Sequence, residues 1–159
     1  MSALTVNIDG LPVPQGSLVS NGFGKGLRHS NHAKLKPWRY TVVSAILQAK
    51  PPDWDPSLPV SVTATFRFPR PQSHYGTGRN ADTLKPSAPA WHIVKPDCDK
   101  VARALGDGIE ESGLVRGDQQ ITSWTYSGAV KELQELEQLE GIACKKTSAS
   151  WTIKAKPQA

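Results

Sequence analysis

The chain has 159 residues, a length that suits one domain with a single hydrophobic core. Its 19 Lys and Arg residues outnumber its 14 Asp and Glu residues, which gives a net charge of +5. This charge favours a polyanionic partner such as nucleic acid, although a basic protein without such a partner fits as well. The two cysteines, Cys98 and Cys144, have no metal-binding or redox spacing, and no signal peptide or long apolar run is apparent. We therefore expect one domain over residues 1–159, in the reducing cytoplasm and without a membrane partner.

The N-terminal third predicts a strand, a basic loop and a helix. Apolar and polar residues alternate from Leu4 to Ile8, which indicates a strand that ends in a Pro/Gly turn. Residues 17–36 form a predicted loop rich in Gly, Ser and Asn, which is either a mobile arm that contacts DNA phosphates or an ordinary solvated loop. The candidate DNA contacts in this loop are Lys25, Arg28, Lys34 and Lys36. A helix is predicted from Pro37 to Ala49, with Arg39 directed towards DNA.

The middle of the chain predicts a half-buried strand and then a long loop. Residues 60–68 alternate between apolar and polar, and we expect this strand to run antiparallel to the first one. Residues 69–94 form a long connection of the kind that is usually functional or disordered. Cations and aromatic rings are interleaved in this loop, which suits contact with a nucleic-acid backbone and with bases. They include Arg70, Tyr75, Arg79, Lys85 and Trp91.

A helix is predicted from Cys98 to Glu111, with Asp97 as its N-cap. At about 100° per residue the apolar side chains fall on one face: Val101, Ala102, Leu105 and Ile109. The polar face carries Asp99, Lys100, Arg103 and Asp107. One interpretation is an ordinary amphipathic helix with a capping aspartate and a surface ion pair between Asp99 and Arg103. The other is that the polar face belongs to a catalytic site.

The C-terminal part predicts two strands around a short helix. A strand is expected from Gln119 to Val130, with Ile121 out of phase at a bulge. An acidic helix is expected over Lys131–Glu140, and a last edge strand over Ser150–Lys154. The predicted fold class is therefore α+β, a small mixed or antiparallel sheet with about two helices packed on it.

Three carboxylates can meet if these elements pack together. Asp97 and Asp99 flank the start of the predicted helix, and Asp118 stands just before the following strand. Clustered carboxylates are unfavourable unless they share a cation or a proton. Oxygen ligands of this kind suit Mg²⁺, for which Mn²⁺ can substitute. An acidic, metal-ready pocket in a basic chain suggests hydrolysis of a phosphodiester.

Three segments of the chain resemble the RusA family of Holliday-junction resolvases, small endonucleases of phages and prophages. The run from Lys95 to Asp99, followed by Arg103 and by Asp118-x-Gln120, resembles the family pattern KPDxDN, a Lys four residues on, and DDxQ. Residues 10–16 resemble the early G-x-P-x-P-K-G turn, and residues 68–74 resemble the F-x-P-x-P-K-S loop. This sequence departs from the pattern at Lys100, Arg103 and Gly117, where the family has Asn, Lys and Asp.

The resemblance implies a metal-dependent endodeoxyribonuclease that resolves four-way junctions by paired symmetric nicks. It implies that Asp97, Asp99 and Asp118 bind Mg²⁺ and that Arg103 is catalytic with them, balancing charge in the transition state. Lys95 and Lys100 would be further phosphate contacts. It also implies a homodimer, because a four-way junction is two-fold symmetric, and a bacterial cytoplasm as the location. The alternatives are a non-catalytic junction-binding protein with a degenerate site, and a general DNA- or RNA-binding domain whose carboxylates are structural.

Overall fold

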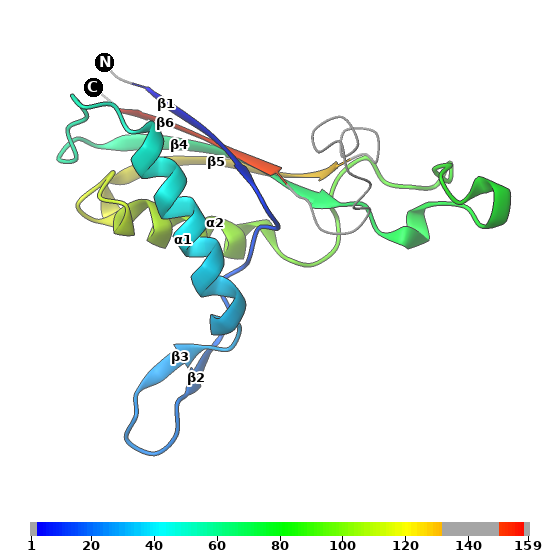
Figure 1. Ribbon diagram of the computed structural model, residues 1–159, viewed down its shortest axis with the longest axis horizontal. Coiled ribbons are helices and arrows are strands. Elements are labelled where there is room, and N and C mark those ends of the chain that lie inside the picture. Colours follow the sequence, from blue (N-terminus) through cyan, green and yellow to red (C-terminus); the bar gives the residue numbers. More distant parts are fainter. Residues whose placement is uncertain (1–2, 132–149, 158–159) are drawn as a thin grey trace.

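The computed structural model is described here for residues 3–131 and 150–157. Within these residues, six strands and two α-helices form an α+β fold, which confirms the predicted class. The strands are β1 (Leu4–Asp9), β2 (Leu18–Ser20), β3 (Leu27–His29), β4 (Val60–Pro69), β5 (Ile121–Lys131) and β6 (Ser150–Pro157). The α-helices are α1 (His32–Ala49) and α2 (Cys98–Glu111), and both lie on the same side of the main sheet (Figure 1).

The main sheet is mixed and has the strand order β1-β6-β4-β5. β6 runs antiparallel to both of its neighbours, and β5 runs parallel to β4. Two predictions are therefore wrong: β4 does not run antiparallel to β1, and β6 is a central strand. Which strands become neighbours depends on pairings between distant segments, and the local pattern of each strand does not contain them.

The buried face of the sheet follows from strict alternation along β4. Val60, Val62, Ala64, Phe66 and Phe68 are buried and pack against the helices, as predicted. β5 continues this face, since Trp124 pairs with Val62 and Tyr126 with Ala64. The predicted bulge is confirmed: Ile121 pairs with Val60 and Ser123 pairs with Ser61, so that Thr122 is the extra residue. The predicted start of β5 shifts from Gln119 to Ile121, because residues 118–120 form a 3₁₀ helix.

Helix α2 has the predicted bounds, and its apolar face is buried, with Val101, Leu105 and Ile109 fully so. Helix α1 begins at His32, five residues before the predicted start, and Pro37 lies inside it. Pro37 removes one intrahelical hydrogen bond, to the carbonyl of Ala33. Both residues are exposed, so water can reach that carbonyl. Leu35, which is buried one turn before Trp38, continues the apolar spacing beyond the proline.

Two arms extend from the body of the molecule (Figure 1). One is the β2–β3 hairpin, so residues 17–36 contain two strands and the first turn of α1 instead of the predicted loop. The other arm lies within residues 69–94 and contains two short 3₁₀ helices, Gln72–His74 and Gly78–Asn80. Both segments from which DNA contacts were predicted therefore contain regular secondary structure.

No helix in the described part of the chain is both long and apolar enough to span a membrane. The acidic helix predicted over Lys131–Glu140 lies outside the described residues except for Lys131, which ends β5.

Candidate active site

The polar face of α2 and the start of β5 form a pocket of about 550 Å³, which we call the acidic pocket. Asp99, Arg103 and Asp107 follow one another at intervals of four residues, so they share one side of the helix. Asp118 joins them from the 3₁₀ helix Asp118–Gln120, which precedes β5. The remaining lining residues are Gln15, Ala102, Gly106, Ile121, Trp124 and Tyr126. Two of the three predicted carboxylates, Asp99 and Asp118, therefore face the same space.

The amide side chain of Gln120 fixes the backbone turn that carries Asp118. The backbone N–H groups of Arg116 and Gly117 donate to Gln120 Oε1 at 2.8 and 3.1 Å. Gln120 Nε2 donates to the carbonyl oxygen of Pro56 at 2.9 Å. This amide thus ties the turn to the connection before β4, which explains physically why a glutamine stands two residues after the aspartate.

Asp97 lies outside the acidic pocket. It precedes α2 at the N-cap position, as predicted, but its side chain makes no capping hydrogen bond. Its carboxylate instead pairs with Lys100 at 3.3 Å and lines a separate hollow with His92 and Lys95. The structure therefore places Asp97 two residues from Asp99 in the chain but in a different recess.

Asp107 lines the acidic pocket and is held from two sides. Gln15 Nε2 donates to Asp107 Oδ2 at 2.8 Å, and Arg39 Nη2 pairs with the same oxygen at 3.1 Å. Arg39 also lies 3.8 Å from Glu111, so its guanidinium faces α2, and its predicted contact with DNA stays a prediction. The interval of four residues after Arg103 is the sequence signal for Asp107, whereas Gln15 and Arg39 come from segments that only the fold brings close.

The start of α2 packs closely against β5. A Cβ at Gly128 would lie 2.6 Å from Cys98 Sγ, so a side chain there would force the Cys98 side chain to move. Partial burial raises the pKa of the Cys98 thiol, and the negative charges of Asp99 and Asp97 raise it further. Cys98 is therefore a packing residue that stays protonated beside the two carboxylates.

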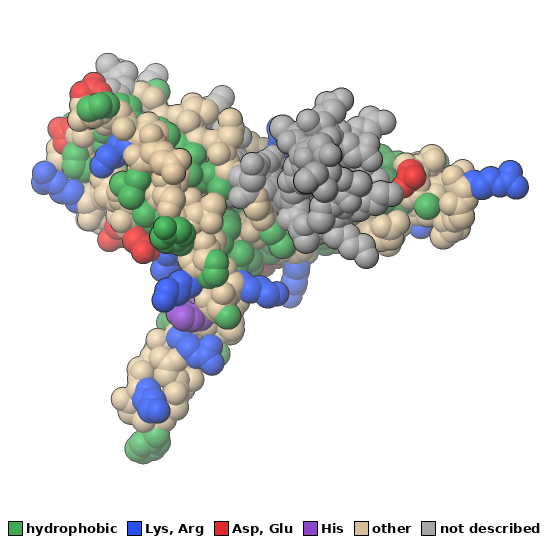
Figure 2. Space-filling view, viewed as in Figure 1, with side chains coloured by type: hydrophobic (Ala, Val, Ile, Leu, Met, Phe, Trp, Pro, Cys, Tyr) green, Lys and Arg blue, Asp and Glu red, His purple; other side chains and the backbone are tan. Residues whose placement is uncertain are grey.

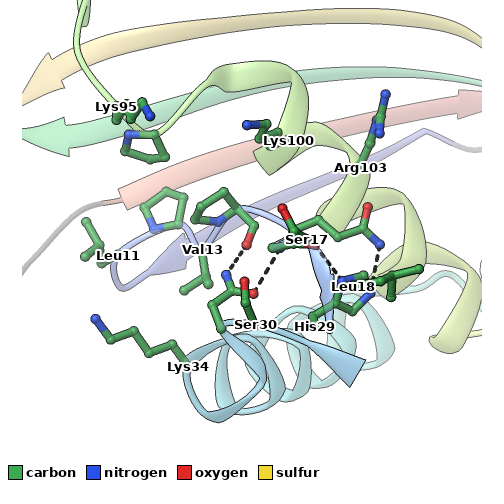
Figure 3. Close-up of a pocket in the computed structure, with 16 residues that line it drawn as sticks. Leu11, Val13, Ser17, Leu18, His29, Ser30, Lys34, Lys95, Lys100 and Arg103 are labelled. Carbon is green, nitrogen blue, oxygen red and sulfur yellow. Dashed lines mark hydrogen bonds between the residues drawn. The ribbon is translucent and has the colours of Figure 1, made fainter. Parts of the chain in front are cut away.

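A second pocket of about 920 Å³, the basic pocket, lies beside the acidic pocket (Figure 3). Arg103 and Gln15 line both pockets. Three of the predicted DNA contacts, Lys34, Lys95 and Lys100, come together here from α1, from the segment before α2 and from α2 itself. Lys25, Arg28, Lys36, Arg70 and Arg79 do not line it.

The predicted contacts outside the basic pocket lie mainly on the two arms. Lys25 and Arg28 belong to the β2–β3 hairpin, where Figure 2 shows basic side chains along the arm and where it joins the body. Arg79 lies in a 3₁₀ helix of the second arm. Arg70 Nη1 donates to the carbonyl oxygen of Pro89 at 2.7 Å, so this guanidinium braces the second arm.

The donor set of the acidic pocket suits a divalent cation with oxygen ligands. Mg²⁺ is usually bound through one or two carboxylates, with water and substrate phosphate completing its shell. Asp99 and Asp118 can supply such carboxylates, and both are exposed. Within residues 3–131 and 150–157, no three His, Cys, Asp or Glu side chains are close enough to hold one ion together. Asp99 and Asp118 are therefore the carboxylates of this pocket that would hold such an ion together with a bound phosphate.

Fold and site together define a class: a small, basic α+β protein in which an acidic pocket adjoins a pocket lined by cations, as in enzymes that act on phosphate esters. Residues 10–137 match the family described as Endodeoxyribonuclease RusA, so the chain belongs to the RusA family. A search of curated proteins gave no match. The family resemblance of the sequence is thus confirmed over most of the chain.

Proposed function

We propose that this protein is a metal-dependent, structure-selective endodeoxyribonuclease that resolves four-way DNA junctions as a homodimer. The observation that carries the proposal is the meeting of Asp99, Asp118 and Arg103 in one pocket, within a chain that belongs to the RusA family. Two carboxylates can hold a divalent ion, and a nearby cation can stabilise the charge that develops on the phosphate.

Asp99 and Asp118 would hold Mg²⁺, with Asp97 joining them if its pairing with Lys100 opens. When bound, the ion supplies Lewis-acid polarisation of the phosphate and a more acidic water. Arg103 would bind phosphate oxygens through its guanidinium and stabilise the charge that develops there. Within the described residues it forms no ion pair, which leaves its guanidinium available to the substrate.

A non-catalytic junction-binding protein is the second candidate. The separation of Asp97 from the acidic pocket favours it, because fewer carboxylates then face the scissile phosphate. It predicts tight binding of a junction without Mg²⁺-dependent nicks.

The test is cleavage of a labelled four-way junction with and without Mg²⁺, by wild type and by Asp99→Asn. We expect Mg²⁺-dependent nicks from wild type, and a loss of about 100-fold or more in Asp99→Asn, equivalent to about 3 kcal/mol of transition-state stabilisation. Binding of the junction should persist, because the change removes a repulsive charge.

Asp53→Asn is the matched control, because Asp53 is an exposed carboxylate that lines neither pocket. It should cut like wild type. Asp99→Asn cutting at the wild-type rate would exclude Asp99 as a metal ligand, and binding by wild type without any nicks would establish the second candidate.

A further inference from the structure

We propose that the basic pocket receives one unstacked nucleotide of the branched DNA, next to the phosphate that is cut. This inference rests on the proposed function and specifies how the same site would recognise its substrate. It assigns a binding role to a pocket built from the turn 11–18, the start of α1 and the beginning of α2.

The chemistry of the walls suits a nucleotide. Five of the lining residues are apolar: Leu11, Pro12, Val13, Pro14 and Leu18. Lys34, Lys95, Lys100 and Arg103 also line the pocket, and among the residues that the structure describes no Asp or Glu does. A base can pack against the apolar side chains while the cations bind the flanking phosphates. Figure 3 shows that Lys34 comes from α1, Lys95 from the segment before α2, and Lys100 and Arg103 from α2.

The position of the pocket links it to the reaction. Arg103 stands between the two pockets, and Gln15 lines both. The backbone N–H of Gln15 donates to the carbonyl oxygen of Lys100 at 3.0 Å, which fixes the turn 11–18 to α2. A strand whose phosphate reaches Asp99 and Asp118 therefore has its neighbouring nucleotide at the mouth of the basic pocket.

The shape of the pocket is set by internal hydrogen bonds. Asn31 Oδ1 accepts from the backbone N–H of Gly16 at 3.0 Å, and Asn31 Nδ2 donates to the carbonyl of Pro14. His29 Nδ1 lies 2.8 Å from the carbonyl oxygen of Gly16. A Cβ at Gly16 would collide with the side chain of Asn31, so the close approach of turn and helix requires glycine.

The size of the pocket favours a single nucleotide over a duplex. A volume of about 920 Å³ is that of a small-molecule site, so a base must leave its stack to enter it. Extruding a base costs least where pairing is already broken. The pocket would therefore favour the branch point of a junction over linear duplex.

The experiment uses four-way junctions that carry 2-aminopurine, whose fluorescence rises on unstacking, on either side of the cut phosphate. Fluorescence is measured without divalent ions, and cleavage is measured with Mg²⁺. Leu11→Trp and Leu18→Trp fill the pocket from two positions. Leu47→Trp is the matched control. Leu47 is 52% exposed, which is close to the 50% of Leu11, but Leu47 does not line the pocket.

We expect a fluorescence rise at one of the two positions with wild type and with Leu47→Trp. The pocket-filling variants should abolish most of this rise and slow cleavage by about tenfold. The inference is overturned if wild type cuts the junction without a rise at either position, or if the rise survives in folded Leu11→Trp and Leu18→Trp. Absence of cleavage by wild type would instead refute the proposed nuclease.

Discussion

At the scale of single residues, Arg103 connects the two pockets. It lies one helical turn from Asp99 and one from Asp107, and it lines both the acidic and the basic pocket. Asp107 already has Gln15 and Arg39 as partners, so its charge is largely balanced without Arg103. Asp107 therefore does not need the Arg103 guanidinium as an ion-pair partner, and under the proposed function this group interacts with the substrate.

We expect Arg103→Ala to lower kcat/KM for junction cleavage by about 100-fold, the usual effect of removing one group that stabilises transition-state charge. Arg103→Lys should retain most of the activity, because a cation remains at the position where the family pattern has Lys. Lys50→Ala at the far end of α1 is the control. Single-turnover cleavage measures all three, and a fully active alanine variant would show that Arg103 is not catalytic.

Some residues of the acidic pocket could be predicted from the sequence, and others could not. Asp99, Arg103 and Asp118 were found from helical spacing and motif resemblance, and they do line one pocket. The separate recess of Asp97 was not foreseen, because a residue just before a helix can turn to either side of it. Gln15 and Arg39 were missed as partners of Asp107, since 92 and 68 residues separate them from it.

At the scale of elements, prediction succeeded where local periodicity decides the structure. Helix α2 and strand β4 each bury a face that their own sequence pattern specifies. It failed at α1, where Pro37 suggested a helix start although the spacing from Leu35 to Trp38 continues through it. It also failed for β6, whose central place depends on pairing with β1 and β4.

The β2–β3 hairpin is an ordered element and not the expected irregular loop. The backbone N–H of Asn21 donates to the carbonyl of Gly26 at 2.9 Å, which closes the arm. Gly22, Gly24 and Gly26 adopt φ values of 108°, 73° and 77°, in the region that favours glycine, so the tip turns without strain. The hairpin therefore presents its cations from a defined scaffold.

We expect Lys25→Ala combined with Arg28→Ala to weaken junction binding and to flatten its salt dependence. Each lost phosphate contact should lower the slope of log K against log salt concentration by about 1, so the double variant should lower it by about 2. Lys50→Ala should leave the slope unchanged. Fluorescence anisotropy over a salt series measures this, and an unchanged slope in the double variant would mean that the hairpin does not contact DNA.

At the scale of the whole molecule, two arms extend from a compact body (Figures 1 and 2), and the described part of this body contains the acidic pocket. Under the proposed function, one such pocket cuts one strand at a time. Resolution of a junction requires two cuts at symmetric positions, and a closed two-fold dimer presents two identical sites in the matching arrangement. A homodimer is therefore the assembly that the proposed function requires.

We expect wild type to convert a cruciform-bearing supercoiled plasmid directly to linear DNA. Two sites in one complex can make both cuts before the complex dissociates, whereas a monomer would first release a nicked circle, whose relaxed cruciform is no longer a substrate.

Mixing wild type with an excess of Asp99→Asn should give mainly nicked circles, because most wild-type chains would then share a dimer with an inactive partner. Agarose gels of the earliest products distinguish these species. Nicked circles as the main product of wild type alone would mean that the chains cut independently. Linear product that persists in the mixture would mean that subunits do not exchange between dimers.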